Sequence, residues 1–272
     1  MTRAEQYRDE MDRLVERLGF REAYDVFRAR LFDQASRGLL TGENIREIVR
    51  QIEPLFEPAA AHQLREIEKQ YDDTLTVVNG LYRDLTSVDA TRDLSRVATI
   101  ERTNRTRWGR YSRETVGFIS KQVRESLSKN ETSKQLAARF EQSVDGKVVK
   151  FADTLARTIV KGHGQECKNE KARLGGVDFF TYVGPPVVTT GIPSTLSHRL
   201  CIELYRSRKR TFSAGDIDQM INGQIKPVRA FKGGYRCRHD WEPDPFYSGK
   251  DYKVTMITVM DGKREVTFGR HV

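Results

Sequence analysis

The chain has 272 residues, and its 47 Lys and Arg against 38 Asp and Glu give a formal net charge of +9. With only 20 Gly and 8 Pro, the composition excludes collagen-like and low-complexity proteins. No run approaches the roughly 18 apolar residues of a membrane span. Charged residues at positions 3, 5, 8, 9, 10 and 12 would disrupt a signal-peptide core, so we expect a cytosolic protein with no membrane partner. The three cysteines are too few for a secreted disulfide scaffold.

Residues 1–145 are expected to form a helical scaffold or docking domain, because apolar residues recur there at helical spacing with few helix-breaking residues. The recurrence is clearest at Phe20, Tyr24, Phe27 and Leu31. Pro54 is expected to stop or bend the segment that begins near residue 45. Thr132 is a predicted N-cap of a short helix.

The remaining residues predict an α+β domain over 146–249 and a tail over 250–272. Asp145-Gly146 is expected to break the helical pattern, and a further helix then leads to short strands near 179–183 and 187–189. Asp261-Gly262, flanked by β-forming runs, predicts a hairpin in the tail. The fold class is therefore α+β: a mainly helical N-terminal half followed by a small α+β C-terminal domain with a terminal β-hairpin.

Basic residues gather in two clusters, and both are candidate nucleic-acid contacts. The first is interleaved with Trp108 and Tyr111, and arginine among aromatics can bind phosphate and stack on bases. A solvated helix face or a subunit contact would explain the same pattern. The candidate residues are Arg102, Arg105, Arg107 and Arg110 in the first cluster, and Arg206, Arg208, Lys209 and Arg210 in the second.

Two Cys/His pairs form a candidate metal site. His198 and Cys201 make one pair, Cys237 and His239 the other, and a closed structural zinc site requires four such ligands. Zinc is thus a possible structural cofactor. Two alternatives stay open: a pair of buried reduced cysteines with His239 bonded to a backbone group, or a disulfide between Cys201 and Cys237.

Enzyme activity is not expected. The sequence has no P-loop, no dinucleotide fingerprint and no His-Glu-x-x-His motif. A Cys-His nucleophile is formally available, but nothing near either thiol in the sequence activates it.

Several segments together resemble one protein family. They are Ala156-Arg157-Thr158, Tyr182-Val183-Gly184-Pro185, Cys201, Phe212, residues 217–224 and the run Gly233-Gly234-Tyr235-Arg236-Cys237-Arg238-His239-Asp240-Trp241. The combination resembles the carboxyl domain of the phage Mu F-like head morphogenesis, or minor head, proteins of tailed phages. The similarity covers roughly residues 135–245, and the final run is its most distinctive part.

This resemblance implies a virion component of the capsid interior or portal vertex, made in the host cytoplasm and incorporated during head assembly. Its expected partners are the portal protein, capsid or scaffold proteins and double-stranded phage DNA. Two other functions are compatible with the residues. One is a metal-dependent DNA-processing enzyme or toxin-like effector, and the other is a purely structural neck or capsid-lining protein without DNA contact.

Overall fold

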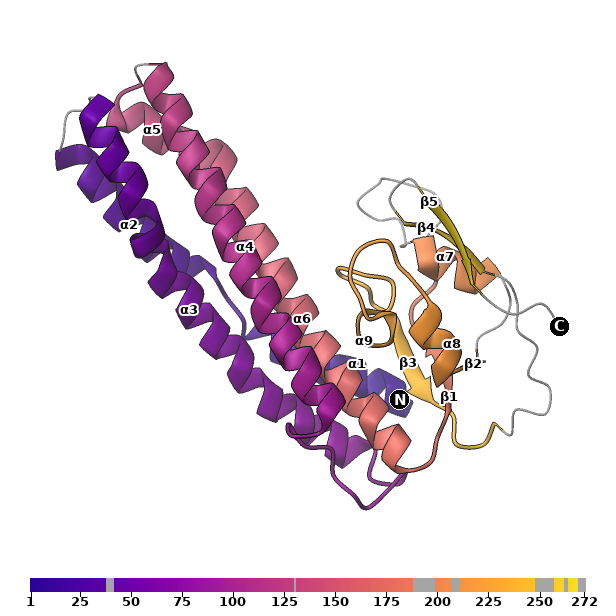
Figure 1. Cartoon of the computed structure of the whole chain (residues 1–272). Helices are drawn as coiled ribbons and strands as arrows, with labels where there is room; N and C mark the ends of the chain where they lie inside the picture. The colour runs from indigo at the N-terminus through magenta and orange to yellow at the C-terminus, as the bar shows by residue number, and fades with distance from the viewer. Residues whose placement is uncertain are drawn as a thin grey trace. The chain divides into compact units, whose positions relative to one another are not determined.

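The computed structural model describes residues 1–37, 42–129, 131–187, 199–206, 211–247, 257–261 and 264–268 (Figure 1). The chain forms two compact units, each assembled from separate stretches of sequence. The helical unit comprises Glu16–Gln70 and Arg102–Arg157. The mixed unit comprises Met1–Val15, Tyr71–Glu101 and Thr158–Val272. Among the described residues, no helix is both long enough and apolar enough for a membrane span.

The helical unit contains α2 (Arg21–Arg37), α5 (Ser133–Arg139), a π-helix (Phe140–Val144) and parts of three longer helices. The longer helices are α3 (Gly42–Leu81), α4 (Ser95–Ser128) and α6 (Asp145–Leu174). Thr132 caps α5 as predicted, with a reciprocal bond to Gln135 that completes a capping box.

Aromatic side chains form the core of the helical unit. Phe20, Phe27 and Phe56 meet edge to face, with ring centroids 6.0 Å apart for Phe20 and Phe56 and 5.2 Å apart for Phe27 and Phe56. Trp108 packs on Phe20, and its indole Nε1 donates to the Ala60 carbonyl over 2.8 Å. The predicted apolar face of α2 is therefore the face that is buried.

The predicted stop at Pro54 and the predicted break at Asp145-Gly146 are wrong. α3 continues through Pro54 and Pro58, which lie one turn apart and are both exposed. Water can therefore satisfy the carbonyls that these prolines leave unpaired. Asp145 and Gly146 also do not end a helix, because the π-helix joins α5 to α6 without interruption. Asp145 is instead buried, where it accepts a hydrogen bond from Tyr24 over 2.7 Å and pairs with Arg28 over 2.9 Å.

The mixed unit is built on a three-stranded antiparallel sheet with the order β2-β1-β3. The strands are β1 (Phe179–Val183), β2 (Thr211–Ser213) and β3 (Asp240–Pro243). The same unit contains α1 (Arg3–Glu16), α7 (Arg199–Arg206), α8 (Ala214–Gln219) and α9 (Val228–Phe231). The expected hairpin in the tail is present as β4 (Ile257–Asp261) and β5 (Arg264–Phe268). The α+β class is confirmed.

The register of the sheet places its large side chains in one core. Phe180 pairs with Phe212 across β1 and β2, and Tyr182 pairs with Trp241 across β1 and β3. All four are buried with Leu200, Cys201 and Leu204 of α7. This core therefore brings α7 against the sheet.

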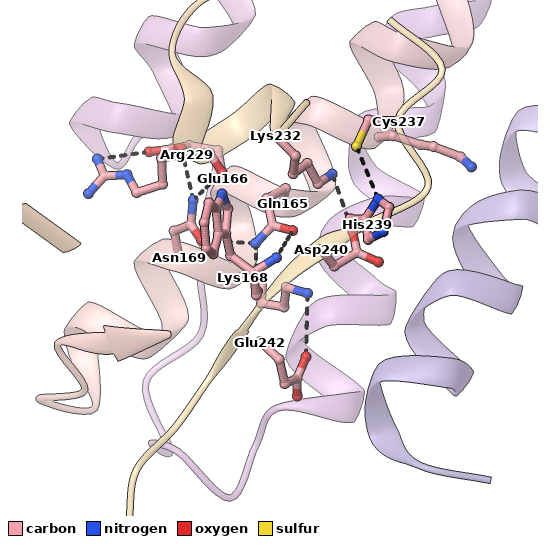
Figure 2. Close-up of polar contacts among 12 residues, drawn as sticks. Gln165, Glu166, Lys168, Asn169, Arg229, Lys232, Cys237, His239, Asp240 and Glu242 are labelled. Atoms are coloured by element: carbon pink, nitrogen blue, oxygen red, sulfur yellow. Dashed lines mark hydrogen bonds and ion pairs between the residues drawn. The ribbon is translucent and has the colours of Figure 1, made fainter. Parts of the chain in front are cut away.

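The second half of α6 is buried on every side, although its sequence is polar. Residues 162–172 are all buried, and Lys168 and Lys171 are fully so. Partners distant in sequence compensate them: Lys168 Nζ lies 3.5 Å from Glu242, and Lys171 Nζ lies 3.0 Å from Asp89. Figure 2 shows this network around Gln165, Lys168 and Glu242. Buried charges are tolerated only when paired in this way.

Candidate metal centre and arginine-rich helix

Three of the four predicted metal ligands lie together in the mixed unit. Cys201 belongs to α7, and Cys237 and His239 belong to the segment that enters β3. One potential ligand atom from each residue lies within 4.8 Å of the other two. The fourth predicted ligand, His198, lies outside the described residues.

The separations between these atoms suit a shared metal ion. The Cys201 and Cys237 Sγ atoms are 3.7 Å apart, and Cys237 Sγ is 3.8 Å from His239 Nδ1. A tetrahedral ion with metal–sulfur bonds of about 2.3 Å holds two sulfurs about 3.8 Å apart. The sulfurs are too far apart for a disulfide, whose bond is about 2.05 Å, and both cysteines are free. The predicted disulfide alternative is therefore wrong for this structure.

The imidazole of His239 is oriented for ligation through Nδ1. Its Nε2 lies 3.0 Å from the Pro185 carbonyl oxygen, which can only accept a hydrogen bond. Nε2 therefore carries the proton, and the lone pair of Nδ1 faces Cys237. The ring also stacks on Tyr182, with centroids 5.0 Å apart and planes inclined by 10°. Gly184 lies so close that a Cβ there would be 2.5 Å from His239 Cδ2.

The surroundings favour a thiolate at Cys237. A hydrogen bond from Cys201 holds the pKa of the Cys237 thiol well below its usual value, although burial opposes the shift. The same bond to Cys237, together with burial, raises the pKa of Cys201. Tyr182 Oη lies 3.1 Å from Cys201 Sγ and 3.8 Å from Cys237 Sγ. A thiolate is the form that binds metals.

Cys201, Cys237 and His239 can therefore hold a metal ion. No family model, curated protein or solved structure matches this chain. The interpretation of the cluster rests on its own geometry.

Two cavities border the three candidate ligands. The larger has a volume of about 830 Å³, and Cys201 and His239 contribute to its lining with residues of α1 and β1. The smaller has a volume of about 330 Å³, and Cys237 is among its lining residues. Gly184 and Pro185 line both cavities. The cluster is thus adjacent to two cavities that share the Gly184-Pro185 turn in their linings.

The first predicted nucleic-acid cluster lies on α4. Arg102, Arg105 and Arg110 are exposed, whereas Arg107 is half-buried and donates to Asn104 over 3.2 Å. Arg105 pairs with Glu68 at 2.5 Å. From Arg102 to Ser128 the helix carries seven Arg or Lys and two Asp or Glu. This part of α4 is strongly basic.

The aromatic part of that prediction is wrong. Trp108 and Tyr111 are 2% and 4% exposed, because both point into the core of the helical unit, and neither can stack on a base. The second basic cluster cannot be placed. The Arg206 side chain and Arg208, Lys209 and Arg210 lie outside the described residues.

Sequence reasoning missed the residues that orient the metal cluster. Tyr182 Oη contacts both thiols, and the carbonyl of Pro185 fixes the His239 tautomer. The segment Tyr182-Val183-Gly184-Pro185 was part of the family resemblance, but its sequence gave these residues no role at the cluster. It also missed Arg124, which lies 11 residues after Arg113, as Arg113 lies 11 after Arg102. All three are exposed, and this spacing keeps them near one face of α4 at intervals of about 16 Å.

Proposed function

We propose that this chain is a minor head protein of a tailed phage, located in the capsid interior or at the portal vertex after assembly in the host cytoplasm. The helical unit binds the portal and the capsid or scaffold proteins. The exposed face of α4 contacts packaged double-stranded DNA. The Cys/His cluster has a structural role.

One observation carries this proposal. The segments on which the family resemblance rests are far apart in the sequence, yet Tyr182, Cys201, Cys237, His239 and Trp241 form one cluster. Tyr182 touches both thiols, stacks on His239 and packs against Trp241 with ring centroids 4.5 Å apart. A shared packing unit explains why these particular residues occur together. The head-protein function follows from the resemblance, which this packing supports.

Association with a portal ring tests the head-protein function directly. The full chain would be co-expressed with the portal protein encoded in the same genome, and the mixture would be separated by gel filtration. We expect the chain to elute with the portal ring. Elution as free protein at every ratio tested would overturn the portal assignment.

The DNA contact is argued from the charges of α4. Arg110 and Arg113 are exposed, and neither pairs with a carboxylate among the described residues. With Arg102, Arg105 and Arg124 they give five exposed guanidinium groups on one helix. Arginines along one helix can neutralise backbone phosphates without contacting base edges, so binding should be independent of the DNA sequence.

Salt dependence is the measurement that tests this contact. Arg105 is paired with Glu68, so the other four arginines are expected to contact phosphates. Four phosphate contacts give a slope of log K against log salt near −3.6, or roughly a 150-fold loss of affinity between 50 and 200 mM salt. The double variant Arg110→Gln/Arg113→Gln should reduce that slope by about 1.8. The matched control is Arg21→Gln/Arg50→Gln, which removes exposed arginines that pair with Asp25 and Glu47. Equal slopes in both variants would contradict the assignment of DNA to α4.

Zinc is the metal we assign to the cluster, with His198 as the fourth ligand. Two thiolates and two imidazoles form a common closed zinc site, and His198 precedes Cys201 by three residues. Protein purified without chelator should contain about one zinc per chain. Cys201→Ser should lose the metal and melt at a lower temperature, whereas Cys167→Ser serves as the control at a cysteine outside the cluster. Full zinc content in Cys201→Ser would refute this site.

A second function is favoured by the cavities beside the cluster. Three protein ligands beside a cavity of about 830 Å³ are also the arrangement of a catalytic metal, which keeps one position for water or substrate. Such a site would make the chain a metal-dependent DNA-processing enzyme. Nicking of plasmid DNA that is lost in His239→Ala would favour it over the structural role.

A further inference from the structure

We propose that Cys237 is a site of oxidation by a small peroxide, and that Cys201 then forms a disulfide with it. In the reduced chain the two cysteines bind the metal, and in the oxidised chain they join α7 directly to the segment that precedes β3. This inference rests on the proposed zinc site, whose regulation it describes. It does not depend on the head-protein function.

The two sulfurs already lie in contact. Their Sγ atoms are 3.7 Å apart, and Tyr182 Oη contacts both, at 3.1 Å from Cys201 and 3.8 Å from Cys237. A disulfide requires an approach of about 1.65 Å, the difference between 3.7 Å and a bond of about 2.05 Å. Rotation of the side chains about their Cα–Cβ bonds brings sulfurs together without moving the backbone far. The reduced pair is therefore a short movement away from the disulfide.

Cys237 is the thiol that an oxidant reaches first. It is half-buried and lines the cavity of about 330 Å³, and Figure 2 shows its sulfur beside His239. Hydrogen peroxide has two oxygens and occupies roughly 60 Å³, or twice the volume of a water molecule, so the cavity can admit it. Cys201 is 1% exposed, but it does not have to meet the oxidant, because its target is the neighbouring sulfur.

The reaction has two balanced steps. The Cys237 sulfur attacks one oxygen of hydrogen peroxide, the O–O bond breaks, and the other oxygen leaves as water with the thiol proton. The product is a sulfenic acid. The Cys201 sulfur then attacks the sulfur of that acid, the S–O bond breaks, and a second water leaves as the disulfide forms. The two sulfurs together lose two electrons, and the peroxide accepts them.

Cys167 takes no part in this reaction. It is fully buried in α6, and its Sγ lies 3.7 Å from His163 Nδ1. It lines neither of the two cavities beside the cluster. Among the described residues, its sulfur thus contacts an imidazole rather than a second thiol. The chain therefore contains its own control for thiol reactivity.

Oxidation exchanges one cross-link for another. A disulfide removes both sulfur ligands, so the metal leaves, but Cys201 and Cys237 stay joined across the 36 positions that separate them in the sequence. Closing such a loop restricts the unfolded chain. The oxidised chain should therefore melt roughly 5–10 °C above the reduced, metal-free chain.

Treatment of the full, zinc-loaded chain with a small excess of hydrogen peroxide tests the proposal. A chromophoric chelator measures the zinc that is released, a thiol reagent counts the free cysteines in denaturant, and mass spectrometry of a proteolytic digest maps the bonds. We expect the count to fall from three thiols to one, with loss of about one zinc per chain. The digest should contain a peptide pair that joins Cys201 to Cys237. Dithiothreitol should reverse all three changes.

Two variants separate the roles of the cysteines. Cys201→Ser lacks the second thiol, so Cys237 should stop at the sulfenic acid, which dimedone traps. The matched control is Cys167→Ser, in which the thiol count should fall from two to zero with the same peptide pair. If Cys201→Ser does not fold, the digest of the wild type still decides the question. A wild type that keeps three thiols, or that yields a sulfonic acid at Cys237 or cross-linked dimers, would overturn the proposal.

The zinc site is judged separately from its oxidation. Zinc content is measured before peroxide is added, and the oxidation is repeated on the metal-free chain. A disulfide that forms in a chain unable to bind zinc would refute the zinc site alone. Bound zinc in a chain that never forms the disulfide, even after the metal has been removed, would refute the oxidation alone.

Discussion

Gly184→Ala tests whether the position of His239 controls metal binding. A Cβ at residue 184 would lie 2.5 Å from Cδ2 and 2.9 Å from Cα of His239, whereas ordinary contacts begin at 3.4 Å. The imidazole must therefore move by about 0.9 Å, which is the difference between 3.4 and 2.5 Å. Metal sites tolerate deviations of about 0.2 Å in ligand distance. We expect the affinity for zinc to fall by about 10- to 100-fold, as it does when a group that orients a ligand is lost.

The assay is competition for zinc between the protein and a chromophoric chelator. Gly215→Ala is the control, because the nearest atom to a Cβ at that position is 3.9 Å away. This variant should bind zinc like the wild type. Wild-type zinc affinity in a folded Gly184→Ala protein would show that His239 is not a ligand held by this turn.

Two further predictions concern stability. Gly162→Ala would place a Cβ 2.3 Å from the ring of Phe231 and should destabilise the chain by about 1–3 kcal/mol. A Cβ at Gly80 meets no atom within 4 Å, so Gly80→Ala should stabilise its helix by about 0.5–1 kcal/mol. Thermal melting that shows the opposite order of stability would refute the packing at Gly162. Burial lowers the pKa of His163 despite its bond to Glu101, so the unfolded chain binds more protons below about pH 6.5 and the free energy of unfolding should fall between pH 7.5 and 5.5. Urea denaturation should show a smaller pH slope in His163→Gln, and an unchanged slope would exclude His163 as its source.

The sequence predicted best where periodicity or turn chemistry is local. The apolar face of α2, the Thr132 cap and the terminal hairpin all depend on neighbouring residues, and all three are present. The proximity of Cys201 to Cys237 was predicted from residue types rather than from a local pattern. This proximity requires the long segment between Cys201 and Cys237 to fold back on itself.

The sequence predicted least where burial depends on distant partners. The polar stretch that follows Lys161 is the most deeply buried part of α6, because carboxylates of other segments neutralise its lysines. No local pattern marks Glu242 as the partner of Lys168. Trp108 illustrates the same limit, since its position among arginines suggested an exposed ring, and only the packing against Phe20 shows that it is buried.

The discontinuous mixed unit has a consequence for biosynthesis. Arg3 Nε donates to Glu242 over 3.0 Å, and 239 residues separate the two in the sequence. At translation rates of about 5–20 residues per second, α1 leaves the ribosome roughly 12 to 48 seconds before β3 has been made. Tyr7 packs against Tyr82 and Lys168, and Met11 lies beside Gly164, so the buried face of α1 lacks its neighbours until α6 has also been made. A nascent-chain chaperone that binds short amphipathic helices should therefore engage α1 until synthesis has passed residue 168.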